Sequence, residues 1–477
     1  MHSSALVITI ATIVIALILG VMAQRNKKMD LEQWTVGGRG FGVLFVFLLL
    51  AGEIYTTFTF LGGSGYSYGM GGPASYILAY GALAYILSYF ILPRLWRYSK
   101  EHKLLSQSDY FATRFNSPGL GILVAVVGVI AIIPYLQLQI TGLGLIMEVT
   151  SYGAVGKVLA MTIGVVVVAL YVTISGIHGS AWTAVLKDIV VLAVVLVVGI
   201  ALPMHVGGLQ VMFEKINTMR PDFLILKNHG MGLMWFISTV ALTSLGFYMW
   251  PHSFSAVFTA KNERVFRRNA TFLPLYQLIL LFVFFAGFAA ILIVPGLKNT
   301  NLALLAAVQK VFPAWFVGVV GGAGILTALV PGSLLIMTGA TLIAENIYRP
   351  LAKASEKQVQ TMARIMVWVI AAVSLYFSIN SNATIVALLL MGYNFVTQFF
   401  PSVILSLFTE HGVNKYGAMS GILVGVSIVV YFTMTKVSIL WGINTGFLAL
   451  LINFIVVWVV SALTPNSPVS ADQPAHF

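Results

Sequence analysis

The chain has 477 residues, of which 59% are hydrophobic and 8% charged, and its 26 basic against 14 acidic side chains give a formal net charge of +12. Because soluble proteins carry about a quarter charged residues, this composition excludes an ordinary soluble enzyme and a disordered chain. Cysteine is absent, which excludes disulfides, thiolate catalysis and zinc–thiolate or iron–sulfur sites. The composition therefore predicts an all-α polytopic membrane protein, since lipid offers no partners for the polar groups of the backbone.

Runs of about 20 apolar residues, the length that crosses the hydrocarbon core, predict 13 transmembrane helices. They lie near residues 5–23, 42–62, 73–93, 120–146, 156–176, 180–204, 231–260, 268–295, 313–346, 357–381, 383–408, 414–435 and 443–464. The first run has no small-residue cleavage site after it and is interpreted as an anchor. The loops near 94–119 and 205–230 have room for one short amphipathic helix each, and we expect the tail, 465–477, to be disordered.

The distribution of basic residues predicts the orientation of the chain. If the N-terminus lies outside, 18 of the 26 Lys and Arg residues fall in cytoplasmic loops and 7 in external ones, while Lys187 lies within a span. This asymmetry follows the positive-inside rule. We therefore expect a multi-pass protein of the cell membrane with a cytoplasmic C-terminus, and we interpret the net charge as a topology signal rather than as a sign of nucleic-acid binding.

Two predicted spans are interrupted by helix-breaking and polar residues. The second contains a carboxylate and several hydroxyls bracketed by glycines: Gly52, Glu53, Tyr55, Thr56, Thr57, Thr59, Gly62 and Gly63. The seventh contains Trp250, Pro251 and His252, and its proline removes a helix hydrogen bond. Five spans start from each break, which is typical of inverted-repeat transporters that bind substrate and ion at paired broken helices. The alternative interpretation is close packing through glycine and a simple proline kink.

Ionisable residues within spans are costly and therefore suggest function. Glu53 is either protonated or paired with a cation or ligand, and both options make it a candidate proton carrier. Lys187 and Asp188 are adjacent on a helix and point about 100° apart, so we expect no good mutual pair. Lys187 is then expected to reach for the interface, and Asp188 is a candidate for an ion path. His252 is suited to binding an anion, taking a proton or capping the broken helix.

Two amides are further candidates for substrate contact. Gln137 and Gln139 lie two positions apart in the fourth span and do not share a face, so only one is expected to point inward, and Gln398 raises the same question in the eleventh. Amides often join helices in membranes, which is the alternative role. The chain has no His-Glu-x-x-His or Walker A pattern and no Gly-x-Ser-x-Gly elbow, so we expect no enzyme and no cofactor.

Several segments resemble the sodium:solute symporter family. They are Trp34-Thr35-Val36-Gly37-Gly38-Arg39, Tyr171-Val172-Thr173-Ile174-Ser175-Gly176 followed by Lys187-Asp188, and Asn346-Ile347-Tyr348-Arg349. The segments 51–56, 250–252 and 328–331 resemble the branch of monocarboxylate permeases, which carry lactate, pyruvate and acetate. The resemblance implies a LeuT-like core of five plus five inverted-repeat helices, here 42–204 and 231–408. The helices 5–23 and 414–464 would be peripheral, and the fourth and eleventh spans would lie near the substrate.

One segment departs from the family pattern. Sodium-coupled relatives have two neighbouring hydroxyl residues in the ninth span, where this chain reads Thr327-Ala328-Leu329-Val330-Pro331-Gly332-Ser333. Depending on register, Val330 with Pro331 or Pro331 with Gly332 occupies those positions, and none of these side chains offers oxygen to a hard cation. Thr327, Ser333 and the carbonyls freed by Pro331 are the alternative donors.

These observations lead to one hypothesis, a symporter that imports a small monocarboxylate with a proton, with sodium as the second choice of driving ion. The substrate contacts would come from Gly52, Tyr55, Thr56, Thr59, Gln137, Trp250, His252 and Gln398. The coupling residues would be Glu53, Asp188, Thr327 and Ser333. A sodium-coupled symporter for another small organic solute, a transporter-like sensor and a membrane acyltransferase are the alternatives.

Overall fold

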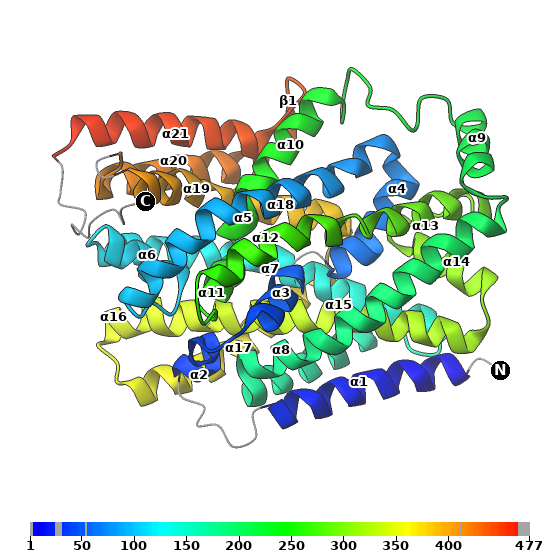
Figure 1. Ribbon diagram of the computed structural model, residues 1–477, viewed down its shortest axis with the longest axis horizontal. Helices are drawn as coiled ribbons and strands as arrows, with labels where there is room; N and C mark the ends of the chain where they lie inside the picture. The colour runs from blue at the N-terminus through cyan, green and yellow to red at the C-terminus, as the bar shows by residue number, and fades with distance from the viewer. Residues whose placement is uncertain (1–2, 24–30, 53–54, 410–411, 466–477) are drawn as a thin grey trace.

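The computed structural model describes residues 3–23, 31–52, 55–409 and 412–465, and these residues form an almost entirely helical bundle (Figure 1). The α-helices are α1 Ser3–Ala23, α2 Leu31–Val36, α3 Val43–Gly52, α4 Ser64–Met70, α5 Tyr76–Glu101, α6 Gln107–Arg114, α7 Pro118–Thr150, α8 Lys157–His205, α9 Leu209–Met219, α10 Leu233–Gly246, α11 Pro251–Val257, α12 Arg264–Gln277, α13 Leu280–Ile293, α14 Ala303–Val311, α15 Ala314–Thr341, α16 Arg349–Ala352, α17 Glu356–Ile379, α18 Ile385–Val396, α19 Phe400–Phe408, α20 Lys415–Met434 and α21 Thr445–Leu463. Short 3-10 and π segments join them: η1 Gly37–Arg39, η2 Phe58–Gly63, η3 Gly72–Ser75, η4 Phe247–Met249, η5 Thr300–Leu302, η6 Leu342–Tyr348 and η7 Thr397–Phe399. The two strands, β1 Ile439–Leu440 and β2 Ile443–Asn444, form a small antiparallel hairpin.

Within the described residues, 11 helices are long and apolar enough to cross a membrane, and the bent pair 233–249 and 251–257 makes up to 12. The predicted span 42–62 corresponds to α3 and η2, which are separated by five residues, two of them outside the described ranges, and it is not among these 11. The short helices expected in the two long loops are confirmed as α6 and α9. A further short helix, α14, was not predicted.

The helix α8 contains two predicted spans joined by a sharp reversal at Gly176. In a straight helix, residues 171 and 183 would lie about 18 Å apart, yet the hydroxyls of Tyr171 and Thr183 are 2.7 Å apart. Gly176 has φ 54° and ψ −151°, a conformation that only glycine adopts without strain. The separation of this region into two spans is therefore confirmed.

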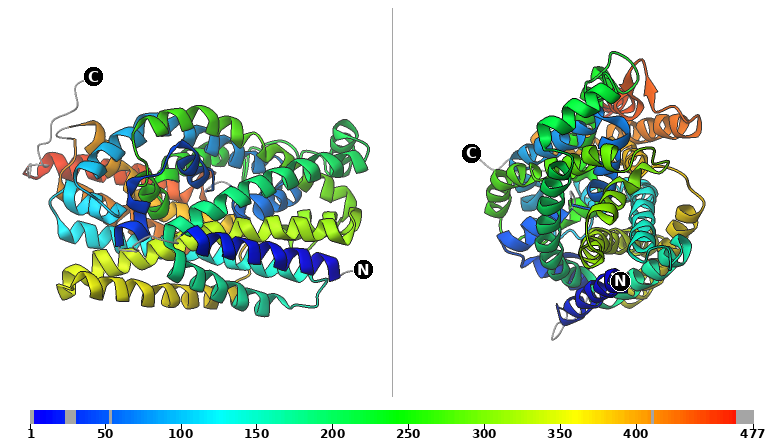
Figure 2. Two further views of the ribbon diagram at one scale, coloured as in Figure 1. Left: turned by 60° about the horizontal axis from the view of Figure 1, so that its bottom comes forward. Right: turned by 90° about the vertical axis from the view of Figure 1, so that its right-hand side faces the viewer.

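The helix α15 forms the centre of the bundle. It is buried almost throughout and packs against α1, α7, α8 and α17. Glycines allow its closest contact: a Cβ added to Gly318 would lie 2.6 Å from the carbonyl oxygen of Ala5, and Thr9 donates a hydrogen bond to the Gly318 carbonyl at 3.2 Å. Small residues are the usual means of close helix packing in lipid. The end-on view in Figure 2 shows the remaining helices arranged around this centre.

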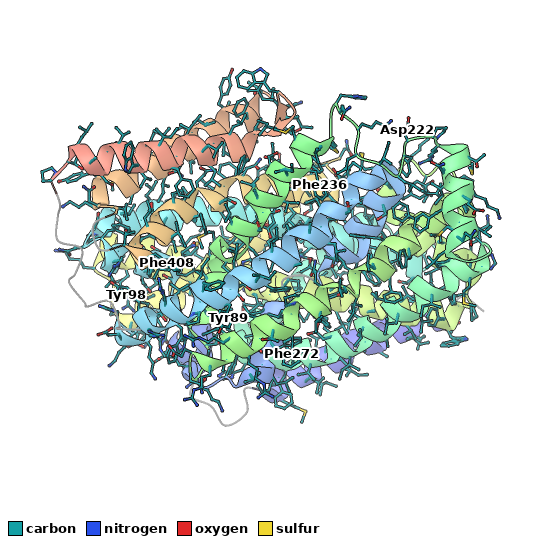
Figure 3. The ribbon with its side chains drawn as sticks, turned by 45° about the horizontal axis from the view of Figure 1, so that its top comes forward. Tyr89, Tyr98, Asp222, Phe236, Phe272 and Phe408 are labelled. Atoms are coloured by element: carbon teal, nitrogen blue, oxygen red, sulfur yellow. The ribbon has the colours of Figure 1, made fainter. Side chains whose placement is uncertain are left out.

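Apolar side chains cover much of the outer surface. Figure 3 labels Tyr89 on α5, Phe272 on α12 and Phe408 on α19, all of which are exposed, and Asp222 in the loop that follows α9. A solvent-facing surface of this kind would be unfavourable in water, whereas it matches the hydrocarbon core of a bilayer.

Four loops rich in basic residues meet at one end of the bundle, where α2, α6 and α16 lie (Figure 1, left). Arg39 donates to the carbonyl of Leu104 at 2.6 Å, Arg97 pairs with Glu263, and Asn346 donates to Asp109 at 2.5 Å. Segments that the charge pattern assigns to one side of the membrane are therefore neighbours in space.

Candidate functional site

The predicted break in the second span is present. The helix α3 ends at Gly52, Tyr55 and Thr56 form a turn, and the chain becomes helical again through the π segment η2 and α4. The described part of α3 ends at Gly52, but the Tyr55 amide still bonds the Ala51 carbonyl at 3.2 Å as in a helix. The interruption follows at Thr56, Thr57 and Phe58, whose amides bond side-chain oxygens. Glu53 is one of the residues outside the described ranges, and its role as a proton carrier stays a prediction.

The hydroxyls of Thr56 and Thr59 cap the second half-helix. The Phe58 amide donates to Thr56 Oγ1 at 3.1 Å, and the Thr56 amide donates to Thr59 Oγ1 at 3.2 Å. Thr59 Oγ1 in turn donates to the Thr56 carbonyl at 3.0 Å. These bonds satisfy amides that a helix start leaves without intrahelical partners. Thr56 and Thr59, which were predicted to contact substrate, therefore use their hydroxyls to stabilise the start of the second half-helix.

Thr57 was not among the predicted site residues, but it is the hydroxyl residue that best fits a binding role. Its amide donates to Oε1 of Gln139 on α7 at 3.4 Å. Its own Oγ1 is buried and has no hydrogen-bond partner among the described residues, and the same holds for Nε2 of Gln139. Thr57 and Gln139 are thus in contact and each has a buried polar atom without a partner among the described residues. Only this unpaired state, which cannot be predicted from the sequence, distinguishes Thr57 from its neighbours.

The predicted break in the seventh span is also present. The helix α10 passes into η4, Trp250 is extended with ψ 131°, and α11 starts at Pro251, with a bend of 54° between the two halves. A residue before proline is pushed out of the helical region, and proline fits the first position of a helix. The interruption predicted from Pro251 is therefore a break between two half-helices rather than the simple kink of the alternative interpretation.

The helix α7 connects the two breaks. Tyr135 and Gln139 are four residues apart and share one helix face. Gln139 bonds Thr57 at the first break, while the Tyr135 ring lies 4.8 Å from the Trp250 ring and 5.5 Å from the His252 ring at the second. All of these residues are buried. One helix face thus joins the regions that the sequence singled out.

The helix α18 lines the same region from another side. The ring of Tyr393 lies 5.3 Å from that of Trp250, and a Cβ added to Gly392 would lie 2.3 Å from Trp250. At the first break, a Cβ added to Gly62 would lie 2.9 Å from Ile385. The fourth and eleventh predicted spans, α7 and α18, therefore both border the broken helices.

The amides Gln137 and Gln398 are not brought into this region. Gln137 Nε2 donates to the Phe377 carbonyl of α17 at 3.3 Å. Gln398 donates to the Gly446 carbonyl at 3.3 Å and accepts from Asn453 of α21 at 3.1 Å. Both join helices, as the alternative interpretation expected, and Gln139 is the amide of the fourth span that meets a break.

Tyr55 is buried beside the first break and is held by α12. Its hydroxyl donates to the Tyr276 carbonyl at 2.9 Å, and the two rings lie 4.7 Å apart. Its side chain is therefore engaged with the protein.

The expectation that Lys187 and Asp188 form no mutual pair was wrong. Lys187 Nζ lies 3.0 Å from Asp188 Oδ1, and Lys187 is 0% exposed, so it does not reach the interface. Helix geometry separates the two Cβ atoms, but the flexible lysine stem spans that separation when both groups are enclosed by apolar helices. The ammonium also donates to the carbonyl of Tyr55 at 3.4 Å.

The hydroxyls of the ninth predicted span are hydrogen-bonded within the protein. Thr327 Oγ1 donates to the Gly324 carbonyl at 2.5 Å. Ser333 Oγ donates to the Val330 carbonyl at 2.6 Å and lies 2.7 Å from Ser180 Oγ of α8. Beside them, Gln139 and Gly332 line a cavity of about 10 Å³ between α7, α8 and α15, which has room for one water molecule at most.

Hydrogen bonds join the helices on both sides of the breaks. At the basic end, the Phe41 amide donates to the Thr259 carbonyl at 2.9 Å, and Trp96 Nε1 donates to the Ala260 carbonyl at 2.8 Å. At the opposite end, the Tyr68 hydroxyl donates to the Val294 carbonyl at 2.8 Å. These contacts therefore close the region of the breaks toward both ends of the bundle.

Paired broken helices in the middle of an enclosed helical membrane bundle define the class of LeuT-fold transporters. The solved structure of a Na+-coupled sialic acid symporter in a substrate-bound outward-open state has this fold, with a TM-score of 0.79, 15% sequence identity and 98% of each chain covered.

The sequence model of the sodium:solute symporter family matches residues 34–425, and the chain belongs to that family. It is 54% identical to the uncharacterized symporter YhjB of Bacillus subtilis, over 99% of this chain and 100% of that protein. It is 27% identical to a monocarboxylate transport permease protein of Rhizobium johnstonii, over 98% of this chain and 99% of that protein. The family resemblance of the sequence motifs is therefore confirmed.

Proposed function

We propose that this protein is a symporter of the cell membrane that imports a small monocarboxylate together with a proton by alternating access. In this proposal it has 13 transmembrane helices with the N-terminus outside, and 42–204 and 231–408 are inverted repeats. The observation that carries the proposal is the pair of buried donors without partners at the first break, Thr57 Oγ1 and Gln139 Nε2.

A carboxylate is the ligand that fits two neighbouring donors of this kind. Leaving a buried donor unpaired costs about 1–3 kcal/mol, and one carboxylate group has two oxygens that accept from both. The second half-helix, η2 and α4, begins at this point, and helix N-termini attract negative charge. The chemistry of the first break therefore favours a small anion.

The second break supplies the apolar part of the proposed pocket. Trp250, Tyr135 and Tyr393 are buried and in ring contact, and they present aromatic surface to the short carbon chain of such an acid. His252 in the same cluster is suited to a second contact with the carboxylate or to holding a proton. A similarity to a monocarboxylate permease over nearly the whole chain supports the same substrate class.

The direct test is uptake of labelled lactate into proteoliposomes, with a pH gradient and a sodium gradient imposed separately. The proposal predicts that an alkaline interior drives accumulation in the absence of sodium. Uptake that needs a sodium gradient and ignores the pH gradient would contradict proton coupling, and no uptake of lactate, pyruvate or acetate under either gradient would contradict the substrate class.

Glu53 is proposed from the sequence as the group that carries the proton, because an ionised carboxylate would repel the substrate anion. Glu53→Gln removes the titrating group with little change in size. We expect it to reduce accumulation against a gradient far more than it reduces exchange of internal for external substrate. Equal reduction of both would contradict this role.

A further inference from the structure

The first break also holds an oxygen-lined position that the protein fills with its own cation. Lys187 Nζ lies 3.4 Å from the Tyr55 carbonyl oxygen and 3.0 Å from Asp188 Oδ1. Tyr55 belongs to the turn after α3, where the Thr59 amide bonds the carbonyl of Thr56. A carbonyl oxygen at a helix break and a carboxylate are the donor types that hard cations prefer.

The surroundings of this position make a permanent charge there unusual. Lys187 is 0% exposed and Asp188 6%, and both lie well inside the span 176–205. Four helices packed against α8 have no charged residue within their bounds, namely α1, α3, α13 and α15. Apart from the ion pair, neither oxygen of Asp188 has a hydrogen-bond partner among the described residues. Without the ammonium, the carboxylate would be left buried and uncompensated, which is strongly unfavourable.

The hydroxyls of the neighbouring helix α15 donate their hydrogen bonds elsewhere. Ser180 lies seven residues before Lys187, two turns along the same face of α8, and its Oγ is 2.7 Å from Ser333 Oγ of α15. Ser333 already donates to its own helix, as Thr327 does one and a half turns earlier. The ammonium therefore acts as the cationic partner of both the broken helix and Asp188.

We propose that the Lys187 ammonium permanently occupies a cation position formed by the Tyr55 carbonyl and the Asp188 carboxylate, so that this position takes no external metal ion. The inference rests on the proposed function in one respect: only in an ion-coupled symporter does Lys187 determine which ion is available to drive transport. With this position filled by the chain itself, a sodium ion cannot bind between the Tyr55 carbonyl and Asp188, and the proton is the remaining driving ion.

The prediction is that removing the lysine side chain creates a sodium site. In Lys187→Ala, the Tyr55 carbonyl and Asp188 are exposed to a vacated space, so Na+ becomes the ion that compensates the carboxylate. The measurement is Tm in detergent as KCl is replaced by NaCl at constant ionic strength. Wild type should show no Na+-specific change, whereas Lys187→Ala should show a rise of about 2 °C or more, because an ion that binds only the folded state stabilises it.

Matched variants separate this position from general effects of charge. Lys310→Ala is the control, because Lys310 Nζ also bonds a carbonyl, that of Ile293 at 2.8 Å, but at the end of α14 and without a carboxylate. It should gain no response to Na+. Lys187→Arg keeps the cation and should gain none. Adding Asp188→Asn to Lys187→Ala removes the carboxylate and should abolish the gain.

Each outcome bears on the inference without any transport substrate. A Na+-specific rise of Tm in wild type, or none in folded Lys187→Ala, would overturn it. If Lys187→Ala yields folded protein only when purified in NaCl, the inference is supported, and if it is unfolded in NaCl and KCl alike while Lys187→Arg folds, the inference fails. Failure of lactate uptake by wild type would instead contradict the proposed function and leave the Na+ result unaffected.

Discussion

Two adjacent threonines at the first break make opposite predictions about stability and transport. Thr56 Oγ1 accepts the Phe58 amide and caps the second half-helix, whereas Thr57 Oγ1 is buried without a hydrogen-bond partner among the described residues. Substitution by valine keeps the shape of either side chain and removes only the hydroxyl. The pair therefore separates the structural use of a hydroxyl from its use in binding.

The expected magnitudes follow from these bonds. Thr56→Val removes a helix cap, which costs about 0.5–2 kcal/mol of stability, so its Tm should fall. Thr57→Val removes no bond within the protein, and its Tm should stay close to that of wild type. A hydroxyl that donates to a carboxylate contributes about 1.5–3 kcal/mol, so Thr57→Val should lower kcat/KM for substrate exchange by about 10- to 150-fold.

The assay combines Tm in detergent with exchange of labelled substrate in proteoliposomes, for wild type and both variants. The reasoning is refuted if Thr57→Val loses stability as Thr56→Val does while its kcat/KM is unchanged. It is also refuted if Thr56→Val has the Tm of wild type, because the capping bond would then contribute nothing to stability.

Four further substitutions test the surroundings of the breaks. Gln139→Met should raise KM about tenfold or more, because it removes both the bond to the first break and an unused donor. Gln137→Met removes only a bond that joins two helices, so it should lower Tm with little change in KM. A larger rise of KM in Gln137→Met than in Gln139→Met would contradict the proposed site. Gly392→Ala places a methyl group where the Trp250 ring lies. Because overpacking costs about 1–3 kcal/mol of stability, both Tm and the exchange rate should fall. Wild-type values of both would contradict the close contact between Gly392 and Trp250. Trp96→Phe removes a hydrogen bond at the basic end and should raise the rate at which a cysteine introduced in α11 is labelled from that side by up to about tenfold. The chain has no cysteine of its own, so the introduced one can be labelled selectively. An unchanged labelling rate would mean that this bond does not hold the end closed.

Local chemistry allowed the architecture to be predicted from the sequence. Long apolar runs predicted the membrane-crossing helices, of which the described residues contain 11 or 12, and Pro251 predicted the second break because it cannot continue a helix. The reversal at Gly176 was predicted as a boundary between two runs, and the structure has non-helical backbone at this glycine. These features depend on the residues of one segment.

The partners of polar side chains could not be predicted, because they depend on distant segments. Helical periodicity separated Gln137 from Gln139 but could not say which face meets the break, and the structure brings Gln139 there. The pairing of Lys187 with Asp188 could not be predicted from the direction of the Cβ atoms alone, because the long lysine side chain spans their separation. Similarly, the capping role of Thr56 becomes visible only when the helix start is known.

The most direct test of the proposed coupling is the steady-state accumulation of labelled lactate in sodium-free proteoliposomes as the imposed pH gradient is varied. For one proton carried with each monovalent anion, the ratio of internal to external substrate should rise about tenfold for each unit of pH difference, since each factor of ten corresponds to about 1.4 kcal/mol. A ratio that stays near one at every pH difference, and rises only when a sodium gradient is added, would contradict the account.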